Sequence, residues 1–216
     1  MRIILIGHGG HSRVITDIIH SNQGYEIVGF LDDRYDKVKV INNTYCGPIS
    51  SANRLVENIY DIKFFIAIGN NNIRQSIVNR LNLSDEYFPS LIHNSAVISP
   101  SAKIGPGTVV MPNAVLNADS RVGKHCIINT SSIIEHDSVI GDFSHISPGV
   151  NITGNVQIGD GSHVGAGSTI IPNIKIGNWS IIGAGSTVIS IIPSYSTAVG
   201  IPARVKKVNG KVLEVT

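Results

Sequence analysis

The stretch INTSSIIEHDSVIGDFSHISPGVNITGNVQI, residues 128–158, carries an isoleucine at every sixth position. The same spacing, filled by Ile, Leu or Val, runs without a break from Ile92 to Val188. Four places after each aliphatic residue the side chain is usually small, and glycine is frequent directly after it. A period of six fits neither a 3.6-residue helix nor a lone strand. It indicates a parallel β-helix built from hexapeptide units.

Each unit is expected to supply one short strand whose aliphatic side chain points inward. The small residue would sit at a tight corner, and the glycine would relieve backbone strain in the turn. Because no unit can bury its apolar face alone, the coils stack on a shared core. With three units per coil, residues eighteen apart lie one strand spacing apart, about 4.8 Å. We expect this domain to span residues 91–192, followed by a C-terminal tail at 193–216.

Residues 1–90 carry a different pattern, in which short apolar runs alternate with helical ones. The runs at 2–6, 26–31 and 63–68 each end in a polar or Gly-rich turn. This alternation predicts a small, Rossmann-like parallel α/β domain. In the first turn Ser12 replaces the third glycine of a dinucleotide fingerprint, which favours a phosphate or nucleotide at the helix N-terminus over NAD. A turn that is merely tight is the alternative.

The composition narrows the class of protein. The 216 residues have a net charge of +2 and only 15% charged side chains, which argues against a nucleic-acid partner. Cys46 and Cys126 lack metal-site spacing and are expected to be reduced thiols. The apolar opening is too short for a signal peptide or a membrane span. We therefore expect a cytoplasmic protein without membrane insertion.

One polar cluster stands out within the repeat. His136 is followed by a carboxylate, Asp137, and a His beside an acid is a credible general base. Gly154 lies eighteen places after His136 and should leave open backbone beside the imidazole. His145 and His163 are also eighteen apart, but no third ligand is evident, so no metal is expected. The isolated His93, His125 and His163 are expected to be surface or corner residues without a role.

Several blocks together resemble a known family over almost the whole chain. They are GHGGHS at 7–12, FLDD at 30–33, FIAIGNN at 65–71, NTSSIIEHD at 129–137, GDFSHIS at 141–147 and GIPAR at 200–204. The chain resembles the left-handed β-helix, hexapeptide-repeat sugar acetyltransferases, above all the bacillosamine-pathway N-acetyltransferases. That branch also holds sialic acid O-acetyltransferase-like and perosamine N-acetyltransferase-like members.

The resemblance implies a homotrimer with active sites at subunit interfaces. Acetyl-CoA would be the donor, and the acceptor would be a UDP-linked 4-amino-4,6-dideoxy-N-acetylhexosamine destined for a cell-surface glycan or exopolysaccharide. His136 would deprotonate the 4-amino group and Asp137 would tune it. His145 would hydrogen-bond the acetyl carbonyl, and Asn129 would orient the amino sugar. The backbone near Gly154, Ala166 and Ala184 would line the pantetheine, and the nucleotide would be surrounded by Gly10, His11, Ser12, Asp32, Asp33 and Gly69.

Two positions depart from the family pattern, since Asp137 stands where those enzymes carry Glu and Ser12 where Gly is common. Three other functions stay open from the sequence. The same His136 could serve O-acetylation of a sialic-acid-like sugar. The prism could be a zinc protein similar to the γ-carbonic anhydrases, or a silent scaffold whose α/β domain senses a nucleotide sugar.

Overall fold

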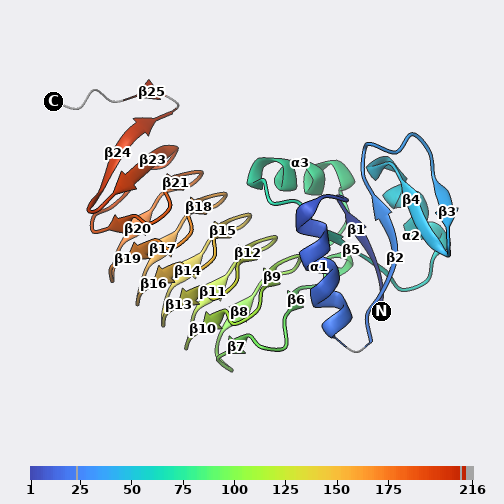
Figure 1. Cartoon of the computed structure of the whole chain (residues 1–216), viewed down its shortest axis with the longest axis horizontal. Helices are drawn as coiled ribbons and strands as arrows, with labels where there is room; N and C mark the ends of the chain where they lie inside the picture. Colours follow the sequence, from blue (N-terminus) through green and yellow to red (C-terminus); the bar gives the residue numbers. More distant parts are fainter. Residues whose placement is uncertain (23, 210, 213–216) are drawn as a thin grey trace.

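A computed structural model describes residues 1–22, 24–209 and 211–212 (Figure 1). The chain forms an α/β domain and a long three-sided prism. Figure 1 shows the α/β domain at the end where the prism begins and the last strands of the chain at the opposite end. No helix in the described residues is long and apolar enough to cross a membrane.

The α/β domain is built on a five-stranded sheet with the order β3-β4-β2-β1-β5. All neighbours in it are parallel except β3 and β4. Its elements are β1 Arg2–Ile6, α1 Gly10–Ser21, β2 Glu26–Leu31, β3 Lys39–Ile41, β4 Thr44–Gly47, η1 Ile49–Ser51, α2 Ala52–Asn58, β5 Ile62–Ile66, α3 Asn71–Leu81 and η2 Asp85–Tyr87.

The prism has the predicted hexapeptide design. Its two-residue strands fall into three parallel sheets, in which each strand pairs with the one eighteen residues further on. They are β6 Leu91–Ile92, β7 Val97–Ile98, β8 Lys103–Ile104, β9 Val109–Val110, β10 Val115–Leu116, β11 Arg121–Val122, β12 Ile127–Ile128, β13 Ile133–Ile134, β14 Val139–Ile140, β15 His145–Ile146, β16 Asn151–Ile152, β17 Gln157–Ile158, β18 His163–Val164, β19 Thr169–Ile170, β20 Lys175–Ile176, β21 Ile181–Ile182 and β22 Thr187–Val188.

The three faces are named here by their strand numbers. The nine-strand face holds β6, β9, β12, β15, β18 and β21, the six-strand face runs from β7 to β22, and the five-strand face runs from β8 to β20. The residues of the expected tail add β23 Ser196–Gly200, β24 Ala203–Val208 and β25 Lys211–Val212 to the nine-strand face. The rest of that tail, 210 and 213–216, lies outside the described residues.

The prism core consists of the six-spaced aliphatic residues, and those from Val110 to Val188 are all buried. The small residues lie inside the corners, where their hydroxyl groups tie one coil to the next. Ser144 Oγ donates to Gly159 O at 2.9 Å, and Ser168 Oγ donates to Gly183 O, also at 2.9 Å. The inward aliphatic and the small corner residue are therefore confirmed.

The expected role of the glycines that directly follow the aliphatic residues is wrong. The left-handed backbone falls two places later, as at Asp137 with φ 60° and Phe143 with φ 59°. The glycines are needed because neighbouring coils approach closely. A Cβ on Gly123 would lie 2.3 Å from Asp142 Oδ1, inside contact distance.

Three other features of the α/β domain differ from expectation. The β3–β4 hairpin turns at Asn42–Asn43, both at positive φ, a signal that the apolar pattern did not reveal. Val14 and Ile73, expected to face inward, are 41% and 50% exposed. Arg74 in α3, expected on the polar face of the helix, is 1% exposed.

Candidate active site

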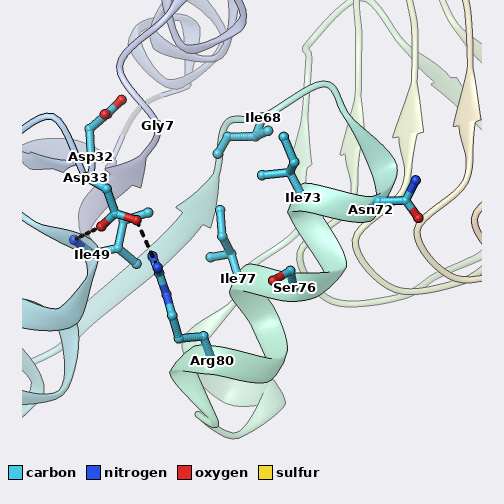
Figure 2. A pocket seen from close by; sticks show the side chains of 10 residues that line it. All are labelled: Gly7, Asp32, Asp33, Ile49, Ile68, Asn72, Ile73, Ser76, Ile77 and Arg80. Carbon is cyan, nitrogen blue, oxygen red and sulfur yellow. Dashed lines mark hydrogen bonds and ion pairs between the residues drawn. The ribbon is translucent and has the colours of Figure 1, made fainter.

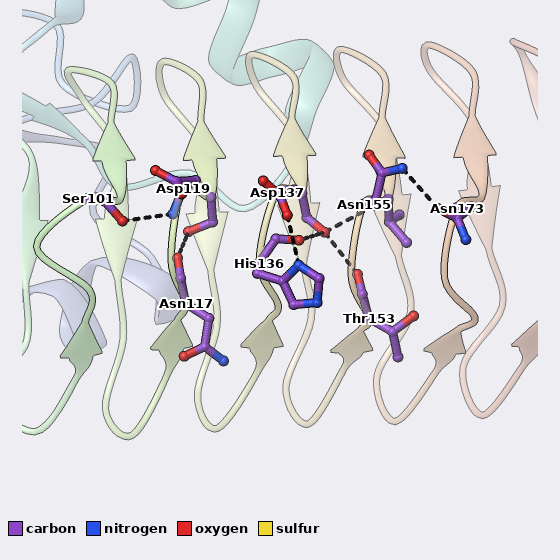
Figure 3. Close-up of polar contacts among 11 residues, drawn as sticks. Ser101, Asn117, Asp119, His136, Asp137, Thr153, Asn155 and Asn173 are labelled. Carbon is purple, nitrogen blue, oxygen red and sulfur yellow. Dashed lines mark hydrogen bonds and ion pairs between the residues drawn. The ribbon is translucent and has the colours of Figure 1, made fainter.

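The prism carries a histidine–carboxylate pair at the corner between the six-strand and five-strand faces. His136 and Asp137 lie in the turn from β13 to β14, and His136 Nδ1 is 2.8 Å from Asp137 Oδ2 (Figure 3). Both side chains are well exposed, at 62% and 60%. The hydrogen bond from Asp137 raises the pKa of His136 above its ordinary value. The pair is thus an accessible base with its Nδ1 proton already held.

Gly154 lies next to this imidazole, one coil further on. A Cβ at Gly154 would come within 2.6 Å of His136 Nε2, so only glycine leaves the ring its position. The stacking predicted from the spacing of eighteen is confirmed. Asp137 itself has a left-handed backbone, φ 60°, which an Asp tolerates better than most residues.

A second polar pair occupies the nine-strand face near its corner with the six-strand face. Asn129 Nδ2 is 3.1 Å from His145 Nε2. The amide orientation follows from its neighbour, because the Thr130 backbone N–H, which can only donate, lies 2.8 Å from Asn129 Oδ1. Nδ2 is therefore the donor and His145 Nε2 the acceptor.

His145 is consequently neutral, with its proton on Nδ1. Burial, followed by the charges of His163 and Arg74, lowers its pKa to about 3. Its ring stacks on His163 with 4.7 Å between centroids, and Ser147 Oγ is 2.9 Å from His163 Nε2. One N–H of the Asn129 amide remains for a ligand, because the hydrogen bonds of the described residues give Nδ2 only this partner.

The two pairs are one prism edge apart. Asn129 and His136 mark the two ends of the six-strand face, a separation on the order of 15–20 Å for about six extended residues. Acetyl transfer requires reacting atoms about 3–3.5 Å apart. Within one chain the structure therefore brings together His136 with Asp137 and Asn129 with His145, but not the two pairs.

The predicted pantetheine residues follow the same division. Ala166 and Ala184 are exposed and stack eighteen apart at the corner above Asn129, where the Gly185 N–H donates to Ala166 O at 2.8 Å. They form a small-residue edge along the prism axis. Gly154 lies at the other corner, with His136.

The α/β domain contains a cavity of about 490 Å³ beside α3 (Figure 2). Its lining is Gly7, Asp32, Asp33, Ile49, Ile68, Asn72, Ile73, Ser76, Ile77 and Arg80. Asp33 accepts from the Ile49 N–H at 3.2 Å and pairs with Arg80 at 2.9 Å. Sequence reasoning found the two aspartates but missed Ile49, Ile73 and Arg80, which come from elements with no glycine or acidic motif.

Asp32 is kept ionised by its surroundings. Burial alone would raise its pKa, but hydrogen bonds from the Arg34 and His8 backbone N–H groups outweigh burial, and the net pKa is lowered. The His8 bond measures 2.9 Å, and the Arg34 side chain adds an ion pair at 3.2 Å. Two carboxylates are thus presented at the ends of the parallel strands, as acceptors that a ribose hydroxyl can use.

The other predicted nucleotide residues are placed differently. Gly10, His11 and Ser12 begin α1, where Ser12 Oγ donates to Gly9 O at 2.7 Å. His11 Nε2 is buried without a partner, and burial followed by Arg74 lowers the pKa of His11 to about 4. Gly69 lines a second cleft of about 690 Å³, between α3 and the prism, with Asn71, Gly161, His163 and Trp179 among its other residues.

The remaining histidine and cysteine residues have structural environments. His125 is 1% exposed and stacks on Phe143 at 5.4 Å, so the expectation of a surface position is wrong for it. Cys126 is buried, and burial raises its pKa to about 12, which excludes a thiolate nucleophile there. Among the described residues no group of three or more His, Cys, Asp or Glu is arranged to hold a metal ion.

A hexapeptide prism with an exposed histidine–carboxylate pair, joined to an α/β domain with a nucleotide-sized cavity, defines a hexapeptide-repeat transferase. Two family models match the chain: the PglD N-terminal domain over residues 2–81, and the bacterial transferase hexapeptide, six repeats, over 155–190. UDP-N-acetylbacillosamine N-acetyltransferase of Bacillus subtilis (strain 168) is 44% identical over 109 residues. That match covers 50% of this chain and 50% of the Bacillus protein, so the chain spans about half the length of this curated relative.

Two solved structures match nearly the whole chain. Perosamine N-acetyltransferase from Caulobacter crescentus, in complex with CoA and GDP-perosamine, is 31% identical with a TM-score of 0.86, over 96% of this chain and 97% of that one. The acetyltransferase domain of PglB from Neisseria gonorrhoeae FA1090, in complex with acetyl coenzyme A, is 36% identical with a TM-score of 0.84, over 94% and 98%. The chain therefore belongs to the left-handed β-helix, hexapeptide-repeat sugar N-acetyltransferases, and the predicted fold and family are confirmed.

Proposed function

We propose that this protein transfers the acetyl group of acetyl-CoA to the 4-amino group of a nucleotide-linked 4-amino-4,6-dideoxy sugar. The observation that carries the proposal is the His136–Asp137 pair, exposed beside the bare backbone of Gly154. The Bacillus relative is named for UDP-N-acetylbacillosamine, so a UDP-linked 4-amino-4,6-dideoxy-N-acetylhexosamine is our first candidate acceptor. The product would serve a cell-surface glycan, and the cytoplasmic location stays a prediction.

The chemistry needs a base, because an amine is largely protonated at neutral pH and attacks only when free. His136 Nε2 accepts the amine proton while Asp137 holds the proton on Nδ1. The nitrogen forms a bond to the thioester carbon, and the carbonyl oxygen takes up the negative charge. The C–S bond then breaks, and the CoA sulfur leaves with the electron pair and takes up a proton. No covalent enzyme intermediate forms.

The oxyanion needs a hydrogen-bond donor, and the structure favours Asn129 for that task. Its amide has one N–H free, whereas His145 Nε2 is the acceptor of the other. His145 would then act by orienting Asn129, instead of donating to the acetyl carbonyl as the resemblance implies. Preorganised donors of this kind contribute roughly 10²–10³ in kcat.

A complete site needs the two corners of the prism to meet, and a second chain supplies the missing corner. The six-strand face between the corners presents an apolar row: Val97, 62% exposed, with Val115 and Ile133 in register beside it. We place this face between subunits of a closed, symmetric homotrimer, with His136 from one chain and Asn129 from the next.

The nucleotide would occupy the cavity beside α3, with Asp32 and Asp33 as acceptors for ribose hydroxyl groups. Acetyl-CoA would lie along the small-residue edge of Ala166 and Ala184, with its phosphates towards the basic side chains of β24. Arg204 and Lys207 are exposed there, and Lys206 is half-buried. The basic end expected from Lys211 falls in β25, whose side chains lie outside the described set.

The test is a thiol-release assay with acetyl-CoA and three acceptors in parallel: a UDP-linked 4-amino-4,6-dideoxy-N-acetylhexosamine, GDP-perosamine and free sialic acid. The proposal predicts CoA release with the UDP-amino sugar and a product heavier by one acetyl group. Release with GDP-perosamine alone would keep N-acetylation and change the nucleotide. Release with sialic acid alone would overturn the proposal.

A further inference from the structure

Arg74 is a buried charge that the proposed chemistry does not use. It lies in α3, is 1% exposed, and heads the set of largest fully buried side chains. Burial lowers its pKa to about 10, so the guanidinium stays charged at neutral pH. No acidic side chain of the described residues forms an ion pair with it. A buried charge is costly unless it is fully hydrogen-bonded.

The hydrogen-bond partners of Arg74 are all oxygens, and they match its five N–H groups. Nε donates to His125 O at 2.7 Å. The two N–H groups of Nη1 face Ile68 O at 3.0 Å and Gly69 O at 3.2 Å. Those of Nη2 face Asn71 Oδ1 at 2.9 Å and Phe143 O at 2.7 Å. The planar fork of an arginine fits this set, whereas a lysine offers three donors from one point.

These oxygens come from both domains of the chain. Ile68, Gly69 and Asn71 form the turn between β5 and α3. His125 and Phe143 hold the same place in successive coils, at the corner between the five-strand and nine-strand faces, and both have left-handed backbone. The guanidinium therefore ties the turn of the α/β domain to two stacked corners of the prism.

Asn71 extends the tie to a third coil. Its Nδ2 donates to Gly161 O at 3.0 Å and Ser162 O at 3.3 Å. Positions 125, 143 and 161 are eighteen apart, so Arg74 and Asn71 together hold three consecutive corners. A column of outward carbonyl groups at this spacing is a property of the hexapeptide coils.

The tie ends on groups that the proposed function requires. The Ile68–Asn71 turn includes Gly69, and His145 follows the Phe143 corner by two residues. We infer that Arg74 is a positioning residue that fixes the nucleotide-sugar turn at Gly69 against the acetyl-transfer face at His145. This inference rests on the proposed function.

The experiment compares wild type with Arg74→Lys and Arg74→Met, with Arg54→Lys as the matched control on the exposed face of α2. Steady-state kinetics would vary the UDP-amino sugar and acetyl-CoA separately. For Arg74→Lys we expect the nucleotide-sugar KM to rise about tenfold and kcat to fall about tenfold, since misplacement by about 1 Å can cost a hundredfold. The acetyl-CoA KM should stay within about twofold, because that edge of the prism is remote from the tie.

Hydrogen–deuterium exchange without substrate gives a readout that does not depend on activity. Amide groups of the Ile68–Asn71 turn should exchange about tenfold faster in Arg74→Lys, while β16 and β19 stay as in wild type. Should Arg74→Met fail to fold, Asn71→Ala provides the second variant, with smaller effects of the same kind.

Two results would overturn the inference: Arg74→Lys kinetics within twofold of wild type, or an equal rise of both KM values with faster exchange throughout the prism. The second result would mean that Arg74 only stabilises the fold. If wild type itself acetylates none of the acceptors, the proposed function fails, and the exchange measurement still decides whether Arg74 holds the turn.

Discussion

Asp137 is the residue on which the basicity of His136 depends. Its Oδ2 lies 2.8 Å from His136 Nδ1, and this hydrogen bond is the main reason that the pKa of His136 is raised. A base must be neutral to accept a proton, so the rate should rise with pH through the pKa of His136. The short Asp side chain reaches the imidazole here without the longer Glu of related enzymes.

Asp137→Asn should move the acid limb of the kcat/KM profile to lower pH, because the amide no longer favours the imidazolium. The plateau should fall about tenfold, since a weaker base takes the amine proton less readily. Asp119→Asn is the matched control, one coil earlier at the same corner and without an imidazole beside it. An acid limb that stays in place in Asp137→Asn would separate the carboxylate from the base.

At this scale the sequence predicts part of the site. His136, Asp137 and Gly154 follow from the hexapeptide count, because the spacing of eighteen stacks them. The proton position on His145 does not follow, since it depends on the Thr130 N–H that orients Asn129. Arg74 could not be predicted either, because its partners are backbone carbonyl groups, which every residue has.

The corner turn is the element that sets the position of the base. At the six-strand to five-strand corner, residues 101, 119, 137, 155 and 173 form one column, and hydrogen bonds such as Asn155 Nδ2 to Asn173 Oδ1 at 2.9 Å link its coils (Figure 3). The turns repeat so regularly that a side chain added in one coil must be accommodated by the next.

Gly154→Ala should therefore move the imidazole and leave the coil folded. The added Cβ would lie within 2.6 Å of His136 Nε2, so the ring must rotate away. We expect kcat to fall at least about tenfold, and the free energy of unfolding to fall by about 1–3 kcal/mol. Pro172→Ala, one coil further on at the same corner, is the control in thermal unfolding and turnover. Unchanged kcat in Gly154→Ala would contradict the stacked arrangement.

Elements were predictable where one pattern determines them. Seventeen six-spaced aliphatic residues from Ile92 to Val188 place every strand of the prism, because only an inward apolar position tolerates no exception. The β3–β4 hairpin was missed because its strand residues are exposed and carry no alternation, as the 54% exposure of Ile41 shows. Helix α3 was predicted, but with Ile73 inward, because the helical period alone does not reveal that Arg74 finds buried partners.

The whole molecule explains why the chemical groups are divided. His136 and His145 are nine residues apart, half a coil, which already places them on different parts of the prism. A single chain thus carries two halves of a site, at opposite ends of an apolar face. The account's central claim is that catalysis joins His136 of one chain to Asn129 of its neighbour.

Co-expression of His136→Ala and Asn129→Ala chains, with different tags, tests that claim most directly. Each variant alone should lose at least about a hundredfold in kcat. In mixed trimers a site is intact when one chain brings His136 and the other brings Asn129, with a chance of one half times one half, so purified mixtures should recover about a quarter of wild-type turnover. Turnover that stays at the level of the separate variants would contradict the shared site.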